Sequence, residues 1–568
     1  MKDHEPGPVP MWQRGYNRRR IVRVLIAAVV ILVCLRTLSS VESIESWLPT
    51  SNRPATAEEY GELQTLPISG FLNDGKAGQR SCDELRYDGQ LQVQTSLYLE
   101  DDLVEMATAL QGHPMIDYLG MDKEGPFEDA VAKTWARLSG SSVWLEDYKV
   151  FLSVTRVIFY NKGVKHWPAI SFLRGQLYDE EWNELKNHTI SWRGTEMTFP
   201  LTFNIPAPYE EGGGFYGPED PRIIIEDGVD DAEPIVVFNM FSDLKTAIRA
   251  MYIFRPFSNV TTILSINGQK ERAMAEKNWA PFFHNERETI AAGQKKWPSQ
   301  YIHFIHSFGP LTVLKCHIGN GWCDLVYEQK IAEGLAGKHG DDHGRMSGGT
   351  NLVPLALKSS PGVHAYVGFP RSHIDVGCKS VSMYRPELLV LTAYGDDFYL
   401  NFLSDSIDFG DAAIPPEGLA DPCGEGHILI ANSIAKWERT RRKDEMTISF
   451  SVADSTVQVL KLHGVHNFLA QLPHLSATLQ RDMSQDGETI WDLRWSAVGK
   501  DVIACSVEAA QNYSIAIAAP FNGLAKGEKP PEEDEKPKEE SKSEGEGDKA
   551  KDDKSDKKDE TVVENLWD

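Results

Sequence analysis

From about residue 143 onward, short apolar runs alternate with polar turn residues for most of the chain. The runs are rich in Val, Ile, Phe and Tyr and end near Gly, Pro, Asn or Asp, which is typical of β-strands joined by turns. Examples are residues 150–159, 223–225, 235–238, 301–305, 365–368, 388–391, 428–430 and 446–452. The pattern predicts an all-β fold. Its spacing fits a sandwich, a barrel or a propeller, and no exact internal repeat selects one of them.

A helical period occurs before these runs. Leu103, Met106, Ala107 and Leu110 recur at helical spacing directly after two aspartates. Because residues three and four apart share one face of a helix, we expect a short helix here. Its apolar face predicts packing beside the main domain rather than a cofactor site.

One apolar run near the start of the chain predicts a membrane anchor. Residues 21–35 are interrupted only by Arg23, basic residues precede the run, and acidic residues follow it. The positive-inside bias then leaves the N-terminus in the cytosol and the rest in the lumen, as in a type II protein of the Golgi membrane. The run is shorter than the roughly 20 residues of a typical span, so it requires a thin membrane or arginines that reach the interface. A cleaved signal peptide is the alternative, although no small-x-small site follows Leu35.

Composition marks the segments that flank the β-rich region. Residues 37–80 are rich in Ser, Pro, Gly and acidic residues, as a stem or linker would be. After Leu524 no large apolar residue occurs until Val562, so this tail cannot bury enough surface to fold. The expected organisation is a cytosolic basic tail at 1–20, an anchor at 21–36, a stem at 37–80, an accessory segment at 81–142, a β-domain at 143–524 and a disordered charged tail at 525–568.

Charge and composition exclude some partners. The 568-residue chain is 41% hydrophobic, which is ample for a buried core. Its net charge is −25, with much of the acidity in the C-terminal tail, so a nucleic-acid partner is disfavoured. A sugar nucleotide is not excluded, because one diphosphate needs only a few cations or backbone N–H groups.

Two further patterns fit a luminal domain. Asn187, Asn259 and Asn512 each begin an N-glycosylation sequon. Of the 7 cysteines, Cys34 lies in the predicted anchor, which leaves an even number of widely scattered ones. They lack the close pairs of a zinc site, so we expect disulfides of unassigned connectivity, with buried free thiols as the alternative.

The strongest candidate for chemistry is residues 216–222, Tyr-Gly-Pro-Glu-Asp-Pro-Arg, which open a β-run. The prolines before Glu219 and after Asp220 restrict the backbone, so the two adjacent carboxylates are held as a preorganised acid or base would require. Arg222 can keep one carboxylate ionised through a bidentate pair. The alternative is an ordinary turn with a surface ion pair, which local physics alone favours.

This motif resembles the EDPR signature of two related families, the β-mannoside phosphorylases of glycoside hydrolase family 130 and the fungal β-1,2-mannosyltransferases of glycosyltransferase family 91. Within residues 140–455 further segments match in the same order, namely Glu-Lys-Asn-Trp at 276–279, Ser-Gly-Gly-Thr-Asn at 347–351, Tyr-Val-Gly at 366–368 and the run 427–437. The transferase is the closer match, because a type II anchor suits it. The resemblance implies a five-bladed β-propeller with short accessory helices and a site at its central channel.

The resemblance also implies an activity. That activity is inverting β-mannosyl transfer, with β-1,2 linkage, from GDP-mannose to α- or β-mannoside ends of cell-wall or secretory glycans. Asp220 is the implied base, and Lys277 is the best candidate for a phosphate contact. The implied substrate-binding residues are Glu219, Arg222, Lys277, Asn278, Trp279, Arg345, Asn351, Arg371 and His373. The alternatives are a β-mannoside phosphorylase or hydrolase, and a glycan-binding propeller without activity.

We expect neither a cofactor nor a metal. His343 lies beside Asp341 and Asp342, but no second cluster follows at ligand spacing. The chain also lacks the Asp-x-Asp triplet through which many Golgi transferases bind a metal and a nucleotide. The sequence therefore predicts metal-independent chemistry.

Overall fold

The computed structural model describes most of the chain between residues 63 and 521. The described residues are 63–73, 81–114, 116, 125–160, 170–208, 215–284, 297–329, 344–355, 363–379, 381–416, 419–440, 442–472 and 498–521. The predicted cytosolic tail, membrane anchor and charged C-terminal tail lie outside these ranges, as does His343.

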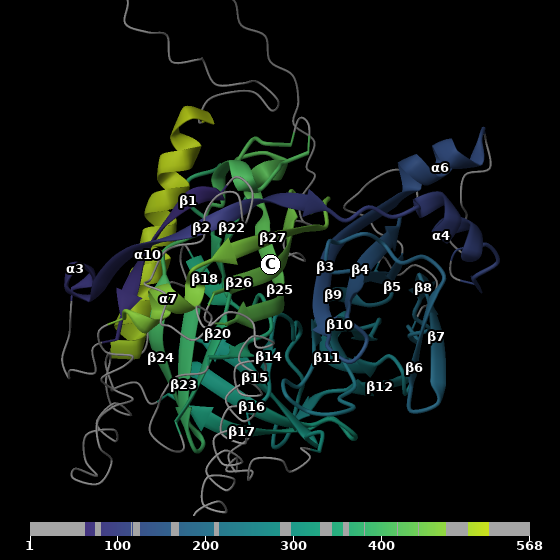
Figure 1. Cartoon of the computed structure of the whole chain (residues 1–568), viewed down its shortest axis with the longest axis horizontal. Helices are drawn as coiled ribbons and strands as arrows, with labels where there is room; N and C mark the ends of the chain where they lie inside the picture. The colour runs from purple at the N-terminus through teal and green to yellow at the C-terminus, as the bar shows by residue number, and fades with distance from the viewer. Residues whose placement is uncertain are drawn as a thin grey trace, which may run out of the picture.

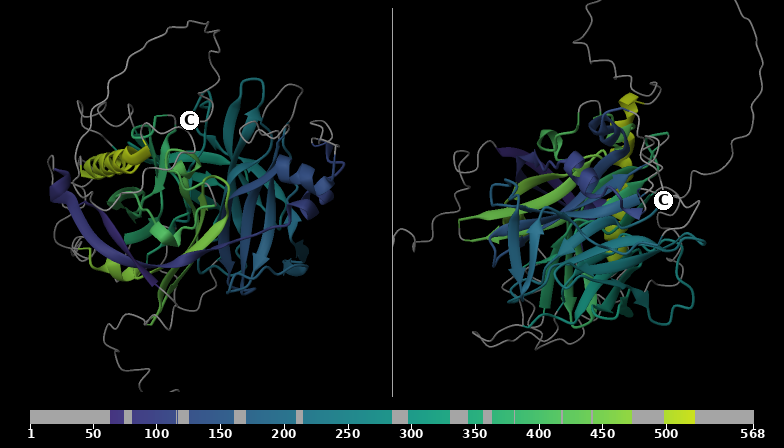
Figure 2. Two further views of the ribbon diagram at one scale, coloured as in Figure 1. Left: turned by 90° about the horizontal axis from the view of Figure 1, so that it is seen from above. Right: turned by 90° about the vertical axis from the view of Figure 1, so that its right-hand side faces the viewer.

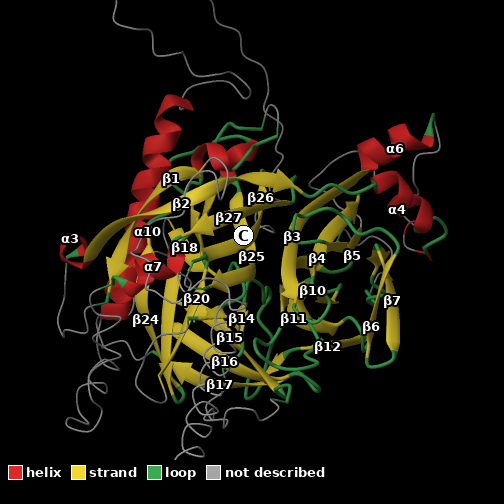
Figure 3. Cartoon of the chain, in the orientation of Figure 1, coloured by secondary structure: helices red, strands yellow, loops and turns green. Residues whose placement is uncertain are grey.

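Strands dominate the described fold, with helices at its periphery (Figures 1 and 3). Blade 1 contains β3 (Trp135–Leu145), β4 (Val150–Phe159), β5 (Ile170–Tyr178) and β8 (Leu201–Thr202). Blade 2 contains β9 (Glu219–Ile224), β10 (Ile235–Asp243), β11 (Ile248–Arg255) and β12 (Val260–Ile263). Blade 3 contains β14 (Ala280–Phe282), β15 (Tyr301–Phe308), β16 (Leu311–His317), β17 (Trp322–Glu328) and the parallel edge strand β13 (Ser265–Ile266).

Blades 4 and 5 complete the set. Blade 4 contains β19 (Val353–Pro354), β20 (Val363–Gly368), β23 (Leu389–Tyr394) and β24 (Asp397–Ser404). Blade 5 contains β25 (Leu429–Arg439), β26 (Asp444–Val452) and β27 (Gln458–His463). Two smaller sheets lie beside the blades. The first is the hairpin of β6 (His188–Trp192) and β7 (Thr195–Phe199). The second contains β18 (Gly344–Ser347), β21 (Arg371–Ile374) and β22 (Met383–Pro386).

The innermost strands of the blades form a closed ring, around which the blades are arranged in Figure 1, and Figure 2 shows the same blades from two other sides. Strand β3 contacts both β9 and β25, and β9 contacts β14. The N–H of Leu352 donates to the carbonyl of Pro281 at 2.9 Å, which joins blades 3 and 4. The Asn351 side chain bonds both backbone groups of Ile434 and so joins blades 4 and 5. The predicted five-bladed propeller is therefore confirmed.

An N-terminal hairpin ties the last two blades together. Strands β1 (Leu63–Leu72) and β2 (Arg86–Tyr98) pair with each other; β1 also pairs with β24, and β2 with β27. The blades thus become one nine-stranded sheet. The predicted boundaries are corrected here, because β1 lies in the expected stem and β2 in the expected accessory segment. Gly70, which reads as a linker glycine, is required because a Cβ would lie 2.6 Å from both Phe402 and Ser404.

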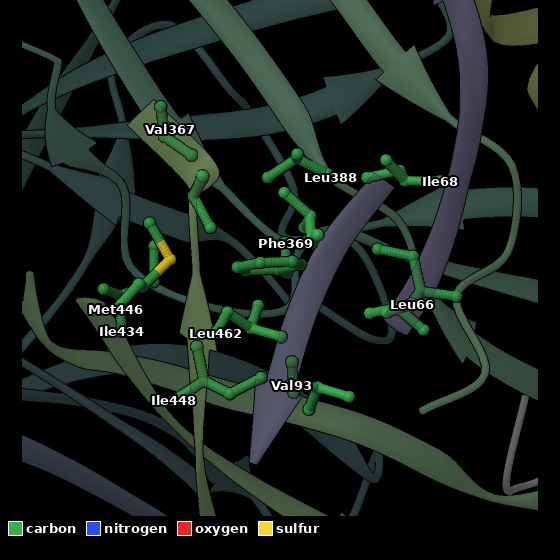
Figure 4. Close-up of a cluster of buried hydrophobic side chains, with 14 of the residues drawn as sticks. Leu66, Ile68, Val93, Val367, Phe369, Leu388, Ile434, Met446, Ile448 and Leu462 are labelled. Carbon is green, nitrogen blue, oxygen red and sulfur yellow. The ribbon is translucent and has the colours of Figure 1, made fainter. Parts of the chain in front are cut away.

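A large hydrophobic cluster fills the space between this hairpin and blades 4 and 5 (Figure 4). Leu66 and Ile68 enter it from β1, and Val93 enters from β2. They meet Phe369 and Leu462, both at most 2% exposed. Since burying a large aliphatic or aromatic side chain contributes about 1.5–3 kcal/mol, the hairpin belongs to the core of the propeller.

Short helices pack on the outside of the blades. These are α3 (Cys82–Leu85), α4 (Leu103–Ala109), α6 (Phe127–Thr134), α7 (Val465–Ala470), and the 3₁₀ turns η3 (Gly410–Ala412), η4 (Glu425–His427) and η6 (Ala519–Phe521). The predicted short helix is confirmed as α4, whose first turn is capped by Asp102 accepting from the N–H of Glu105. With α6 it covers one end of blade 1 through Met106 and Val131.

The sequence did not predict the longest helix of the described residues, α10 (Val498–Ala518). By length and composition, residues 502–521 could cross a membrane. Here α10 lies along β24, β21, β18 and β1, and Val502, Cys505 and Ala510 on it are at most 3% exposed. Those contacts bury part of its apolar surface, while Ile515 stays 52% exposed.

The predicted disulfides are confirmed, and the structure supplies their connectivity. They are Cys82–Cys505, Cys316–Cys323 and Cys378–Cys423. The first links α3 to α10, and the second joins neighbouring strands β16 and β17. All three predicted glycosylation asparagines are exposed, but Ser514 of the third sequon is buried and donates to the carbonyl of Val376. Glycan attachment itself stays a prediction.

Candidate active site

The backbone around Asp220 is bent away from regular strand geometry at the start of β9. Asn239 pairs with Glu219 and Val237 with Arg222, so β9 carries one extra residue between these pairs. Such a bulge re-aims a side chain. Asp220 has φ 51°, in the left-handed region, which costs about 1–2 kcal/mol for a residue with a Cβ. Strain of this kind persists only where the surroundings hold it, and it gathers at functional sites.

Gly217 sets up this bend three residues earlier. It has φ 81°, and a Cβ there would lie 2.0 Å from the carbonyl oxygen of Ser171. The N–H of Ser171 also donates a hydrogen bond to the carbonyl of Tyr216, at 2.8 Å. The segment before the two carboxylates is therefore pinned to β5, and only glycine fits position 217.

The two carboxylates meet one arginine from β4, Arg156. Its Nη1 lies 3.3 Å from Oδ1 of Asp220, and its Nη2 lies 3.5 Å from Oε1 of Glu219. Its Nε donates to Oγ of Ser171 at 3.0 Å, which fixes the guanidinium. Glu219 also pairs with Arg249 at 3.3 Å and is 7% exposed. The side chain of Asp220 is 28% exposed, so Asp220 alone of the two reaches open space.

The expected bidentate pair of Arg222 with a carboxylate is wrong. Its Nε donates to the carbonyl of Gly349, and its Nη1 donates to the carbonyl of Pro221 at 2.9 Å. Arg222 thus spans from blade 2 to the turn before blade 4. Burial, and then the nearby Arg371, lower the pKa of Arg222 to about 10. The ion pair with Asp220 that was predicted for Arg222 is formed by Arg156.

Sequence reasoning missed Arg156 and Arg249. Each lies within an apolar strand, β4 or β11, where a charged side chain is buried only when it has a partner. That mismatch between residue and pattern was the available signal. Neither position belongs to a matched motif, so the resemblance did not point to them.

Two motifs far apart in sequence pack directly on each other. The N–H of Gly348 donates to the carbonyl of Asn278 at 3.0 Å, and a Cβ at Gly348 would lie 2.2 Å from that oxygen. Arg371 joins them, since its Nη2 donates to Oδ1 of Asn278 at 2.7 Å. Its Nε is buried without a hydrogen-bond partner among the described residues. The structure therefore brings Lys277, Asn278 and Arg371 close together.

Cations dominate the electrostatics of this place. Burial by itself would raise the pKa of Asp220, but Arg156, Arg371, Arg222 and Lys277 together hold that pKa below its usual value. Burial, then Arg371 and Arg249, lower the pKa of Lys277 to about 8, against the opposing effect of Asp220. Asp220 is therefore ionised at neutral pH, and Lys277 lies in a field that disfavours its positive charge.

Two residues predicted to contact the substrate, Trp279 and Asn351, have structural roles instead. Trp279 is 3% exposed and packs on Phe304, with ring centroids 5.7 Å apart, so its ring is not available to a sugar. Asn351 is 3% exposed, and its amide bridges to Ile434, so it holds two blades together. Lys277 lies among charged side chains, whereas Trp279, two residues later, packs in the hydrophobic core. The sequence motif alone did not separate these two environments.

Arg345 and His373 lie on the small sheet beside this place. They are cross-strand partners between β18 and β21. Arg345 is exposed and contributes to the lowered pKa of Lys277, which places its charge near that amine. His373 is 2% exposed, and its ring stacks on Tyr384 at 4.6 Å with an interplanar angle of 10°.

A separate cavity of about 160 Å³ lies at the opposite end of β9. It is lined by Trp192, Arg193, Glu226, Asp231, Ala232, Glu233, Ile235, Arg255, Ser258, Phe283, Pro298, Ser299 and Ile318. None of the predicted site residues lines it. Among the residues that the structure describes, no group of three His, Cys, Asp or Glu side chains could hold a metal ion. Metal-independent chemistry remains a prediction.

The comparisons of sequence agree on one family. A family model described as "Beta-mannosyltransferases" matches residues 81–252 and 254–513. Beta-mannosyltransferase 1 of Komagataella phaffii is 32% identical over 491 residues, covering 81% of this chain and 73% of that protein. Beta-mannosyltransferase 3 of Candida albicans is 30% identical over 462 residues, covering 76% and 79%. A solved β-1,2-mannobiose phosphorylase from Listeria innocua, in complex with β-1,2-mannobiose, aligns with 60% of this chain and 93% of its own, at 12% identity and a TM-score of 0.33.

Proposed function

The chain belongs to the β-mannosyltransferase family, and from that premise we propose that it transfers mannose from GDP-mannose to mannoside ends of glycans, forming a β-1,2 linkage with inversion. That it is a glycosyltransferase follows from the family. The donor, the linkage and the roles of individual residues are our proposal. The observation that carries it is one ionised, partly exposed carboxylate, Asp220, surrounded by cations.

In this mechanism an acceptor hydroxyl attacks the anomeric carbon of the donor from the β face. A new C–O bond forms while the bond from that carbon to the diphosphate breaks, and GDP leaves with the electron pair. Asp220 accepts the proton of the acceptor hydroxyl, either directly or through a sugar hydroxyl. Because its pKa is held below the usual value, Asp220 is ionised across the neutral range and so is in the form that accepts a proton.

The departing diphosphate needs positive charge where its negative charge develops. Arg371 offers a guanidinium whose Nε has no partner among the described residues, and Lys277 and Arg345 bring two more positive charges to its side. Preorganised charges of this kind act most strongly where water is excluded. Arg156 and Arg249 serve Glu219 and Asp220 instead, so they position the base rather than the leaving group.

We place the propeller in the Golgi lumen, behind the anchor at residues 21–36. The three disulfides support this part of the proposal, because disulfides persist in oxidising compartments. The exposed sequons at Asn187 and Asn259 are consistent with the same location. Microscopy of a tagged full-length chain with a Golgi marker tests the location, and a cytosolic signal would contradict it.

The decisive experiment uses the full chain, purified in detergent. It is supplied with GDP-mannose and defined α-mannosides, and the linkage of the product is determined by NMR. We expect a β-1,2-linked mannose and stoichiometric GDP. A parallel reaction contains β-1,2-mannobiose with and without inorganic phosphate. Phosphate-dependent release of mannose 1-phosphate, without transfer from GDP-mannose, would identify a phosphorylase instead, and binding without turnover would identify a glycan-binding propeller.

A further inference from the structure

The small sheet β18–β21–β22 has two faces with different neighbours. Ile374 and Met383, which pair across β21 and β22, pack in one cluster with Val507 and Ala510 of α10. Directly paired residues in antiparallel strands point to the same face, and the next residues along point to the other. His373 and Tyr384 are the neighbouring pair of residues in β21 and β22. They therefore lie on the other face of the sheet, which is turned away from α10.

Those residues form a continuous row. Arg345 pairs with His373, and His373 pairs with Tyr384. Tyr384 in turn forms a bridge with Ile428, which brings the ring of His427 to 6.4 Å from the Tyr384 ring. We call Arg345, His373, Tyr384 and His427 the four-residue row. It presents a cation, then three rings side by side.

The row is rigid where it is buried and accessible at its ends. His373 is 2% exposed and stacks on Tyr384. Tyr384 and His427 are partly exposed, and Arg345 is exposed. A ring held in place by a stacked neighbour loses little entropy when a planar ligand packs against it, and preorganisation of this kind favours binding.

The row begins next to the cations proposed to receive the diphosphate. Arg371 lies two residues before His373 on β21, so both side chains share one face. Its guanidinium carbon is 5.9 Å from the Tyr384 ring centroid, while its Nη2 reaches Asn278 beside Lys277. A molecule held by Arg371 through a phosphate can therefore extend along the row.

We propose that the four-residue row binds the base and ribose of a nucleoside diphosphate, and that it thereby distinguishes a nucleotide donor from inorganic phosphate. The inference rests on the proposed function, since it assumes that the donor is a nucleotide sugar. A purine base has two aromatic faces, and the stacking of a base on an aromatic side chain contributes about 1–3 kcal/mol to binding. The exposed Arg345 adds a guanidinium that can stack or donate hydrogen bonds to the base.

The test compares two ligands that share a diphosphate and differ in the nucleoside. Binding of GDP and of inorganic pyrophosphate to the full chain in detergent is measured by calorimetry. We expect Tyr384→Leu to weaken GDP binding about ten- to hundredfold, as loss of one stacking ring predicts, and to leave pyrophosphate binding within about twofold. Leucine keeps an apolar side chain at the site, and the melting temperature reports whether the variant is folded.

Two further variants sharpen this test. Tyr384→Phe retains the ring and should bind GDP nearly as well as the unmodified protein. Tyr301→Leu, which alters a 40% exposed tyrosine on blade 3, is the matched control and should change neither affinity. The inference would be overturned if Tyr384→Leu bound GDP as tightly as the unmodified protein, or if it lost affinity for both ligands equally. Neither result would contradict the proposal that GDP-mannose is the donor. If the unmodified protein binds GDP no better than pyrophosphate, the nucleotide donor itself is wrong.

Discussion

The two ends of β9 both gather charged side chains, but they use them differently. At the Asp220 end, two carboxylates face six cations, namely Arg156, Arg222, Arg249, Lys277, Arg345 and Arg371. At the other end, three carboxylates and two arginines line the 160 Å³ cavity. The first end is strongly positive, and the second is close to balance.

The carboxylates at the far end are satisfied by ordinary hydrogen bonds. Glu226 accepts from the N–H and Oγ of Ser299 at 2.7 and 2.6 Å. Glu233 accepts from the N–H and Oγ of Ser258, both at 2.6 Å. Such groups stabilise loops and need no ligand. A polar cavity alone is therefore weaker evidence for a reaction than an excess of one charge around a strained, partly exposed carboxylate.

The sharpest way to break this comparison is to neutralise one aspartate at each end. Asp220→Asn should lower kcat by about 10²–10⁴-fold, because it removes the proposed base. Asp231→Asn is the matched control, since Asp231 also has a left-handed φ, 54°, and lines the far cavity. It should transfer mannose at the unmodified rate. Equal rates for the two variants, with equal melting temperatures, would remove Asp220 from the mechanism.

Removing one cation at each end should have the next largest effect. Arg371→Ala should reduce kcat/KM for GDP-mannose by about 10²–10³-fold, as loss of one preorganised donor does in other sites. Arg193→Ala, at the far cavity, should leave that value unchanged. Steady-state kinetics with varied donor measure both. If Arg371→Ala changed only the KM for the acceptor, the diphosphate would have to bind elsewhere.

The dependence of transfer on pH should sharpen the contrast further. Lys277, whose pKa is lowered to about 8, carries its charge below that pH and loses it above. The value of kcat/KM for the donor should therefore fall about fivefold between pH 8 and pH 9 and about tenfold per pH unit above that, since this value reports the free enzyme. Lys277→Arg, which stays charged, should move the fall to higher pH. A profile that Lys277→Arg leaves unchanged would assign the fall to another group.

The smallest effect on transfer is expected from Glu226→Gln. This variant weakens two charge-assisted hydrogen bonds to Ser299 at the far cavity, and each such bond contributes about 1.5–3 kcal/mol. We expect a lower melting temperature and unchanged kcat. Thermal unfolding and kinetics on the same sample check both expectations. A large loss of kcat at full stability would show that the far cavity takes part in the reaction.

The fold could be predicted from sequence only in part. Alternating runs predicted strands such as β4 and β26, because each is long and bounded by turn residues. The number of blades came from resemblance, since the blades share no visible repeat. Strand β1 was missed because Pro67 and Gly70 read as a linker, although Leu66 and Ile68 alternate toward the core. What fixes β1 is pairing with β24, more than 300 residues away, which no local pattern contains.

The candidate site was also predicted only in part from the sequence. Asp220, Lys277 and Arg371 were expected together, because three motifs carried them. Arg156 was missed because its carboxylate partners lie about 60 residues away and meet it only through the bulge in β9. Trp279 was misassigned because neighbouring residues in a loop point in different directions. Motifs locate the chemistry, while the residues that orient it depend on packing between strands.

The position of the hairpin β1–β2 near the start of the chain has a consequence for folding during synthesis. Of the described strands, β1 and β2 are synthesised first, yet the strands that cover their outer edges, β24 and β27, are synthesised more than 300 residues later. The cysteine that anchors the turn of the hairpin finds its partner 423 residues later. Until then the hairpin has open edges, which can pair with other nascent chains. We therefore expect chaperones to shield strands β1 and β2 until helix α10 has been synthesised.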